Sequence, residues 1–203
     1  DYLPTGRLNA TQPETVADYL NKVKEHEANG LAFDQNQAST REALWRKNII
    51  HLSGGVSERE LALYRQYVDD FKDIAVGPYL GAHVITRNKS TNNAVELLNI
   101  SEQVNKGVGM ITFFGHSATT LTDIEIGFVT NEQLGYDNQG KYTTILVNGC
   151  NAGNIFTPTK TFGEDWVNAP GRGAVNFFAH ADEGISSILK RYTEVFYETA
   201  FED

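Results

Sequence analysis

The sequence of 203 residues contains a single cysteine, Cys150. One cysteine excludes an internal disulfide, and it excludes a zinc site built from several thiolates. It leaves open the use of the thiol as a nucleophile. The surroundings of Cys150 are therefore the most informative place in the sequence.

An excess of basic residues is also missing. The chain has 17 Lys and Arg against 26 Asp and Glu, a formal net charge of -9, and no basic run. A nucleic-acid-binding surface needs clustered Lys and Arg, so we expect no nucleic-acid partner. Neither a GxxxxGK[ST] phosphate loop nor a GxGxxG fingerprint is present, so we expect no nucleotide site.

Long apolar runs are missing as well. No run approaches the roughly 18 residues of a membrane-spanning helix, so we expect no membrane span in this segment. The first residues, 1–4, lack the methionine, basic region and apolar region of a secretion signal. The last residues, 200–203, follow an apolar helical face without a capping residue. We expect this segment to be part of a longer protein.

The patterns that are present predict an α/β fold. Hydrophobic residues make up 40% of the chain, which can bury one core, so we predict one domain over residues 1–203. Short runs that are apolar on both faces alternate with helical patterns. This alternation predicts a three-layer α/β/α sandwich with a mainly parallel sheet. The predicted strands are residues 48–52, 82–86, 108–114, 143–147 and 173–179.

Four helices are predicted from apolar periodicity and capping residues. The first covers residues 12–28, with Thr11 and Glu14 at capping-box spacing and Asn29-Gly30 as its end, and a loop follows over residues 34–40. The other helices are one that starts after Ser57 with Glu60 as its capping partner, one over about 92–105, and one with an apolar face of Ile185, Ile188, Leu189, Tyr192, Val195 and Phe196.

Reactive side chains follow three of the predicted strands. His116 comes two residues and Cys150 three residues after a predicted strand, each directly after a glycine, and His180 follows the last strand. Reacting groups in open α/β sheets gather beyond the carboxyl ends of the strands. If the strands before His116 and Cys150 are neighbours, the imidazole can exchange a proton with the thiol.

Gly115-His116 and Gly149-Cys150, 34 positions apart, resemble the catalytic motifs of the gingipain family of caspase-like cysteine peptidases. The resemblance covers nearly the whole chain and implies a caspase-like fold, an acyl-enzyme mechanism, and a secreted or surface-bound bacterial protein with protein or peptide substrates. Further landmarks are Thr5-Gly6-Arg7-Leu8, Gly163-Glu164-Asp165-Trp166-Val167, 169–174 and 191–197.

The resemblance assigns roles to several residues. Cys150 would attack the scissile carbonyl, and His116 would act on the proton, mainly at the leaving amine. The backbone N–H groups of Ser117 and Cys150 would hold the oxyanion, with Ser117 standing where the family usually has Gly. The family's third polar residue, which orients the His, would be Glu58, although a position beside Ser57 also suits a helix N-terminus.

The third strand end offers further candidates. By the resemblance it lines the pocket for the substrate's P1 side chain, where Asp182 or Glu183 would attract a basic residue, unless they only form a polar loop or cap. His180 is a rival to His116. Asp123 and Glu125 are expected to be solvated loop charges.

Three functions remain open on the sequence. The first is an endopeptidase or transpeptidase, and the second is an inactive gingipain-like domain that serves as a structural or binding module of a large surface protein. The third is an unrelated doubly wound domain that binds a small ligand. The chemistry requires no cofactor and no catalytic metal. The resemblance allows structural calcium on acidic loops, although no EF-hand pattern is present.

Overall fold

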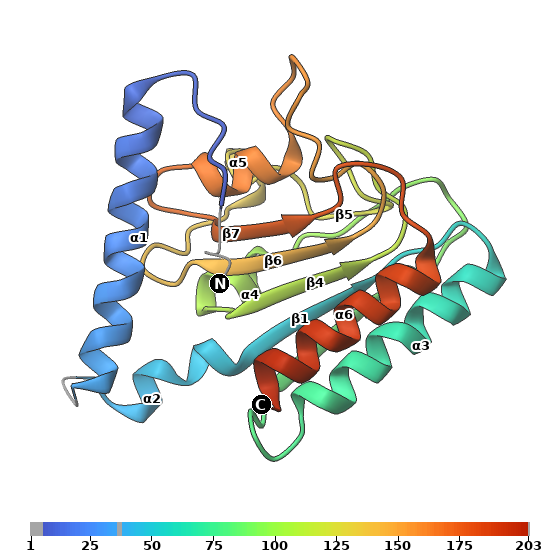
Figure 1. The fold of residues 1–203 in the computed structure, drawn as a ribbon, viewed down its shortest axis with the longest axis horizontal. Coiled ribbons are helices and arrows are strands. Elements are labelled where there is room, and N and C mark those ends of the chain that lie inside the picture. The colour runs from blue at the N-terminus through green and yellow to red at the C-terminus, as the bar shows by residue number, and fades with distance from the viewer. Residues whose placement is uncertain (1–5, 36–37, 203) are drawn as a thin grey trace, which may run out of the picture.

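The computed structural model describes residues 6–35 and 38–202, which form a five-stranded parallel sheet between layers of helices (Figure 1). The strand order is β2-β1-β4-β6-β7. All five predicted strands are confirmed, because each is apolar enough to be covered on both faces. Their bounds are β1 Asn48–Ser53, β2 His83–Asn88, β4 Met110–Phe114, β6 Thr143–Asn148 and β7 Ala174–Ala179.

The helices cover the two faces of the sheet, as the sequence predicts. Figure 1 shows α3 and α6 side by side on one face, with α1 and α5 on the other. The bounds are α1 Pro13–Asp34, α2 Thr40–Ala43, α3 Glu58–Ala75, α4 Ser101–Lys106, α5 Phe162–Asn168 and α6 Ser186–Phe201, with short 3₁₀ helices η1 Leu44–Lys47 and η2 Glu132–Leu134.

Each face of the sheet has its own apolar core. Phe71 of α3 and Leu189 of α6 pack with Phe114 of β4 on one side. Trp166 of α5 and Val104 of α4 belong to the cluster on the other side. The strands thus contribute to both clusters, which is why they read as unbroken apolar runs.

The first helix is longer than predicted. Its N-cap is Gln12, without a side-chain cap hydrogen bond, so the Thr11 to Glu14 capping box is wrong. The helix also continues through Gly30 to Asp34. Gly30 costs about 1 kcal/mol relative to Ala but does not break a helix, and Asn29 Nδ2 donates to the Gly140 carbonyl at 3.0 Å, which ties this turn to the body. Of the predicted loop 34–40, residues 36 and 37 lie outside the described residues.

The predicted helix over 92–105 is wrong except for its last turns, which form α4. Its first half contains β3 (Glu96–Leu97), which pairs in parallel with β5 (Ile124–Glu125). The carboxylate of Glu96 accepts the N–H groups of Ser90 and Thr91 at 3.0 and 3.1 Å. These contacts fix an extended segment that periodicity alone cannot distinguish from a helix.

The apolar face predicted for α6 is only partly buried. Leu189 and Tyr197 face the sheet, whereas Ile188 and Tyr192 are 59% and 70% exposed. Periodicity marks every apolar position of a helix, but only one side of α6 has the sheet and α3 beneath it. The described part of the chain contains no helix of the length and apolar character that a membrane crossing requires.

A chain of polar contacts joins α6 to the sheet. Thr193 Oγ1 donates to Asn148 Oδ1 at 2.6 Å, and Asn148 Nδ2 donates to the Phe113 carbonyl at 3.2 Å. The hydroxyl of Tyr197 lies 2.8 Å from His51 Nε2 and 2.6 Å from Thr112 Oγ1. These buried groups set the position of α6 along β4 and β6.

Candidate active site

The strand register places His116 and Cys150 at one edge of the sheet. β4 and β6 are parallel neighbours, and Phe114 is paired with Asn148. His116 follows Phe114 by two residues, and Cys150 follows Asn148 by two residues. The prediction that the two strands are adjacent is confirmed, and both turns leave the sheet at the same level.

The two turns are joined by a direct hydrogen bond. Ser117 Oγ donates to the Cys150 carbonyl at 2.7 Å. A Cβ atom at Gly149 would meet Ser117 Oγ far inside contact distance and would lie 2.9 Å from the Gly115 carbonyl oxygen. Glycine is therefore required at 149, because the backbones approach too closely for any side chain.

Ser117 fits its turn without backbone strain. Within residues 6–35 and 38–202, the non-glycine residue with a positive φ is Asn151, at 59°. Ser117 forms an antiparallel bridge with Thr122. A serine in place of the family's usual glycine is thus compatible with this turn, and its hydroxyl has a structural use.

Cys150 is partly buried beneath the third strand end. The N–H of Gly184 is directed at the sulfur, with the nitrogen 3.4 Å from Sγ, and the Gly184 carbonyl oxygen lies 3.9 Å from it. The Asn151 N–H donates to the Asp182 carbonyl at 3.0 Å. The thiol is therefore neither sealed in the core nor free of neighbours.

The imidazole of His116 contacts Glu60 and not Glu58. His116 Nε2 lies 3.2 Å from Glu60 Oε1, and the ring also meets Tyr64 edge-on, with centroids 6.0 Å apart. Burial alone would raise the pKa of the Glu60 carboxyl, but hydrogen bonds from the Val56 N–H and the His116 ring outweigh it and lower the pKa. Glu60 thus presents a charged carboxylate to the imidazole.

Sequence reasoning missed this role of Glu60 because it assigned the residue to a capping box. Ser57 Oγ does accept the Glu60 N–H at 3.3 Å, so Ser57 is the N-cap of α3. The carboxylate of Glu60, however, accepts the Val56 N–H at 3.0 Å and reaches His116. Glu58 is an exposed first residue of α3. The side chain of an acid at the third helical position can reach back over the loop that precedes the helix. This position was the feature of the sequence that could have identified Glu60 as a partner of His116.

Asp123 and Glu125 are not solvated loop charges, contrary to the prediction. Asp123 is 2% exposed, and its Oδ2 accepts the Gly55 N–H at 2.6 Å. Glu125 accepts the N–H groups of Thr122 and Gly127 at 2.9 and 2.7 Å. Burial raises the pKa of both carboxyls. Both acids hold backbone that would otherwise lack partners.

The third strand end reaches the site through its backbone. The His180 carbonyl accepts the Gly153 N–H at 2.8 Å, while the His180 ring meets Tyr192 of α6 edge-on. Asp182 and Glu183 are exposed, and Asp182 Oδ1 accepts the Glu183 N–H at 2.8 Å. Asp182 thus contacts the Cys150 turn through its backbone carbonyl, and the described residues show no hydrogen bond from either carboxylate to Cys150 or His116.

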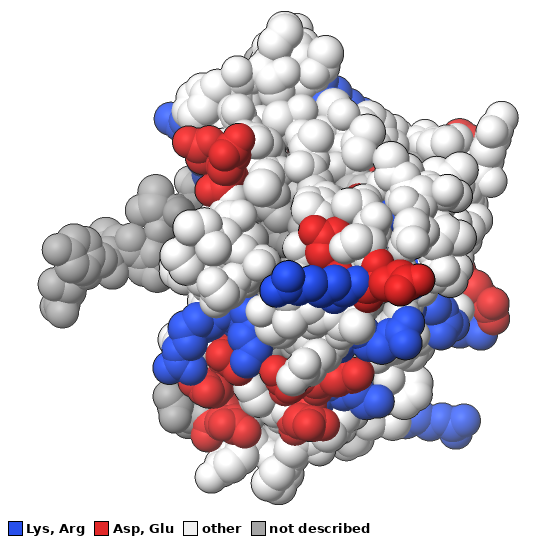
Figure 2. All heavy atoms as spheres, turned by 90° about the vertical axis from the view of Figure 1, so that its right-hand side faces the viewer, with Lys and Arg blue, Asp and Glu red and all other residues white. Residues whose placement is uncertain are grey.

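Charges of both signs are mixed at the carboxyl ends of the strands. Figure 2 looks onto this side of the molecule, where basic and acidic side chains alternate over the lower half and the upper half is largely uncharged. No field of one sign covers this face. Among residues 6–35 and 38–202, no three His, Cys, Asp or Glu side chains are grouped so that they could hold a metal ion.

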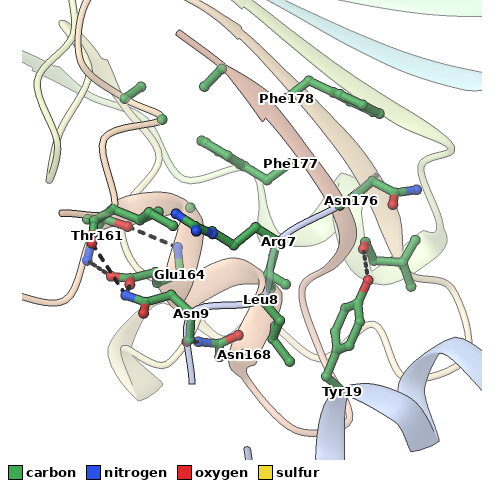
Figure 3. Close-up of a pocket in the computed structure, with 18 residues that line it drawn as sticks. Arg7, Leu8, Asn9, Tyr19, Thr161, Glu164, Asn168, Asn176, Phe177 and Phe178 are labelled. Atoms are coloured by element: carbon green, nitrogen blue, oxygen red, sulfur yellow. Dashed lines mark hydrogen bonds between the residues drawn. The ribbon is translucent and has the colours of Figure 1, made fainter. Parts of the chain in front are cut away.

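A cavity of about 510 Å³ begins beside the Cys150 turn, at Ala152 and Gly153, and runs along β7 (Figure 3). Several landmarks of the resemblance line it, including Arg7 and Glu164, whereas Thr5 lies outside the described residues. Cys150 and His116 are not among its lining residues. The cavity is therefore a neighbour of the candidate site and not the site itself.

Comparison with known proteins gives one family and several similar structures. The model of Peptidase family C25 matches residues 2–203. The Arg-specific cysteine proteinase gingipain R (RgpB) has 18% identity and a TM-score of 0.63 over 78% of this chain and 37% of its own. In the complex of Porphyromonas gingivalis RgpB pro- and mature domains, the values are 17%, 0.57, 76% and 37%.

A further structure, described only as a protease, has 14% identity and a TM-score of 0.65 over 89% of this chain and 37% of its own. The chain thus spans a little over a third of the length of each similar structure. No curated protein sequence matches it. These likenesses show a caspase-like α/β/α fold.

Proposed function

Because the chain belongs to peptidase family C25, we propose that Cys150 is the nucleophile and His116 the proton-transfer residue of a cysteine peptidase acting on proteins. The observation that carries this proposal is the register of β4 and β6, which brings a thiol and an imidazole out of one sheet edge on turns joined by the Ser117 to Cys150 hydrogen bond. The chemistry needs this convergence in space and no proximity in sequence.

The acyl-transfer steps use groups already described. The sulfur of Cys150 forms a bond to the scissile carbonyl carbon, the C–N bond breaks, and His116 delivers the proton lost by the thiol to the leaving amine. Water then cleaves the thioester in a peptidase, and a second amine does so in a transpeptidase. In the tautomer that donates Nε2–H to Glu60, Nδ1 is the nitrogen that exchanges the proton.

Two backbone groups support an oxyanion site. The hydrogen bonds found within residues 6–35 and 38–202 leave the N–H groups of Ser117 and Cys150 without an acceptor. Free N–H donors beside a nucleophile are suited to the charge that develops on the carbonyl oxygen. This favours an active site over an inactive module, as does the unstrained backbone of Ser117.

The finer features of the function follow from the same family. We place the protein outside the bacterial cell or on its surface, with exported proteins as substrates. The exposed carboxylates of Asp182 and Glu183, beside the Cys150 turn, favour a basic P1 residue by charge complementarity. No cofactor is needed, and any calcium would have a structural role.

Digestion of a peptide library with varied P1 residues tests the proposal. Wild-type protein should cleave, and Cys150→Ala should not, with circular dichroism showing that both are folded. Cleavage that survives in Cys150→Ala would contradict the mechanism. Absence of cleavage by both, together with a Cys150 that resists iodoacetamide at neutral pH, would favour the inactive module.

A further inference from the structure

Gly55, in the loop between β1 and α3, is held from two sides by buried charged side chains. Asp123 Oδ2 accepts the Gly55 N–H at 2.6 Å, and Lys89 Nζ donates to the Gly55 carbonyl at 2.8 Å. Asp123 is 2% exposed and Lys89 is 1% exposed. The φ angle of Gly55 is 125°, a conformation that side-chain-bearing residues rarely adopt. A negative and a positive side chain thus hold the backbone of Gly55 in one specific conformation.

The two charged residues also connect this loop to its neighbours. Lys89 Nζ donates to the Asn93 carbonyl, and the Lys89 N–H donates to the Ser53 carbonyl at 2.8 Å. The Asp123 N–H donates to the His116 carbonyl at 2.9 Å. Asp123 is therefore bonded both to the glycine loop and to the turn that carries the candidate catalytic imidazole.

Asp123 packs closely against Gly54 and Gly115. A Cβ atom at Gly115 would lie 2.6 Å from Asp123 Oδ1, and one at Gly54 would overlap the same oxygen. Within the described residues, Oδ1 is buried without a side-chain or backbone partner at ordinary hydrogen-bond geometry. Burying a carboxylate oxygen without a hydrogen bond costs free energy, so the position of Asp123 calls for an explanation.

The loop that Asp123 holds leads directly to Glu60. Val56 follows Gly55, and its N–H donates to Glu60 Oε2 at 3.0 Å, while Glu60 Oε1 faces His116 Nε2 at 3.2 Å. Displacement of Gly55 would shift the Val56 N–H and release one oxygen of Glu60. Contacts therefore run from Asp123 to the imidazole by two routes, through the loop and Glu60 and through the His116 carbonyl.

We infer that Asp123 is a positioning residue for the pair His116 and Glu60, with Lys89 as the second arm of the same clamp. This inference rests on the proposed function for its effect on catalysis. Asp123 does not touch a substrate and acts only through the backbone of Gly55 and His116. Glu125, two residues further on, holds only the N–H groups of Thr122 and Gly127, so it provides a matched control.

The substitution Asp123→Asn tests the clamp without a change in volume. Burial raises the pKa of Asp123, whereas the N–H groups of Gly55 and His116 and the charge of Lys89 oppose the rise. The carboxylate accepts the Gly55 N–H through Oδ2 and is attracted by the charge of Lys89. An asparagine has nearly the same shape but no negative charge, and its amide has one oxygen instead of two. The attraction to Lys89 is therefore lost in a folded protein, and the Gly55 hydrogen bond survives only in the amide orientation that turns the oxygen towards Gly55. Lys89→Met removes the other arm.

Activity provides the first measurement. In Asp123→Asn and Lys89→Met, kcat should fall about tenfold or more with KM within about twofold, since small misplacements of a catalytic group cost this much. Glu125→Gln should retain the wild-type values. The double variant with Glu60→Gln should be slower by clearly less than the product of the two single effects, because one of the two routes from Asp123 to the imidazole runs through Glu60.

Nitrogen-15 resonances of the His116 ring provide a second measurement that needs no substrate. Asp123→Asn should remove the ring signature of the Nε2 to Glu60 hydrogen bond, as Glu60→Gln does, while Glu125→Gln keeps it. This result stands even if the wild-type protein cleaves nothing, in which case only the proposed function fails. Wild-type ring resonances and a wild-type kcat in folded Asp123→Asn would overturn the inference.

Discussion

The turns at the carboxyl ends of β1, β4 and β6 differ in kind from the outer face of α6. At the turns, groups such as Ser117 Oγ and the Asp123 carboxylate meet one partner at one distance. On the outer face of α6, Ile188 and Tyr192 expose apolar surface. Hydrogen bonds are directional and apolar burial is not. Changes at the turns should therefore alter geometry, whereas changes on the outer face of α6 should alter only the apolar area that is buried.

The largest effect is expected from Gly149→Ala. The added methyl group would overlap Ser117 Oγ and crowd the Gly115 carbonyl, so the two turns must separate. We expect a loss of about 3 kcal/mol or more in the free energy of unfolding in urea, and loss of cleavage. Gly30→Ala is the control, because nothing lies within 4 Å of its Cβ position. Equal stability of both variants would show that the close approach of the two turns at Gly149 is not required for folding.

Acid should weaken the α6 layer through His51. Burial lowers the pKa of His51 from the ordinary histidine value of 6.5 to about 4. The unfolded chain therefore binds a proton between these values while the folded protein does not, so stability falls as pH drops from 6.5 towards 4. The loss is about 3 kcal/mol over this window.

Urea unfolding at pH 7 and pH 4.5 measures this loss in wild type and in His51→Gln. The variant should lose clearly less stability between the two pH values, because its side chain does not titrate. Equal pH dependence of the two proteins would show that other groups cause the acid effect.

The two faces of α6 should respond differently to truncation. Leu189→Ala removes a buried side chain and should cost about 2 to 4 kcal/mol, whereas Ile188→Ala removes an exposed one and should cost less than about 0.5 kcal/mol. Thermal or urea unfolding at several protein concentrations checks this. A large, concentration-dependent cost for Ile188→Ala would mean that a second copy covers the outer face.

A smaller effect on catalysis distinguishes two acids of the same helix. Glu60→Gln should lower kcat about tenfold, equal to about 1.4 kcal/mol, because the carboxylate facing His116 loses its charge. Glu58→Gln should leave kcat unchanged, since Glu58 is exposed and does not contact the imidazole. Steady-state kinetics of the two variants measures the contrast, and the reverse order of effects would restore Glu58 as the orienting residue.

The strands and the position of the His116 and Cys150 turns at one edge of the sheet could be predicted because they depend on local patterns. A run that is apolar on both faces, such as residues 143–147, predicts a buried parallel strand, and parallel strands end at the same edge. Glycines beside His116 and Cys150 then indicate where backbones approach.

The other features depend on partners that are distant in the sequence. Asp123 is buried because Gly55 and the His116 turn close around it, and its own neighbours in sequence do not show this. Glu96 is extended because it pairs with β5, although the apolar periodicity of residues 92–105 predicts a helix. Glu60, and not Glu58, contacts His116 because its side chain points towards the turn that follows β4. This direction cannot be inferred until the positions of β4 and α3 relative to each other are known.

The hydrogen bond between Thr193 and Asn148 couples the position of α6 along the sheet to the position of the Cys150 turn. Asn148 precedes Cys150 by two residues, so a helix that slid along the sheet would pull the thiol with it. A displacement of α6 that starts on its exposed side would therefore reach Cys150 through Asn148, without any contact at the thiol itself.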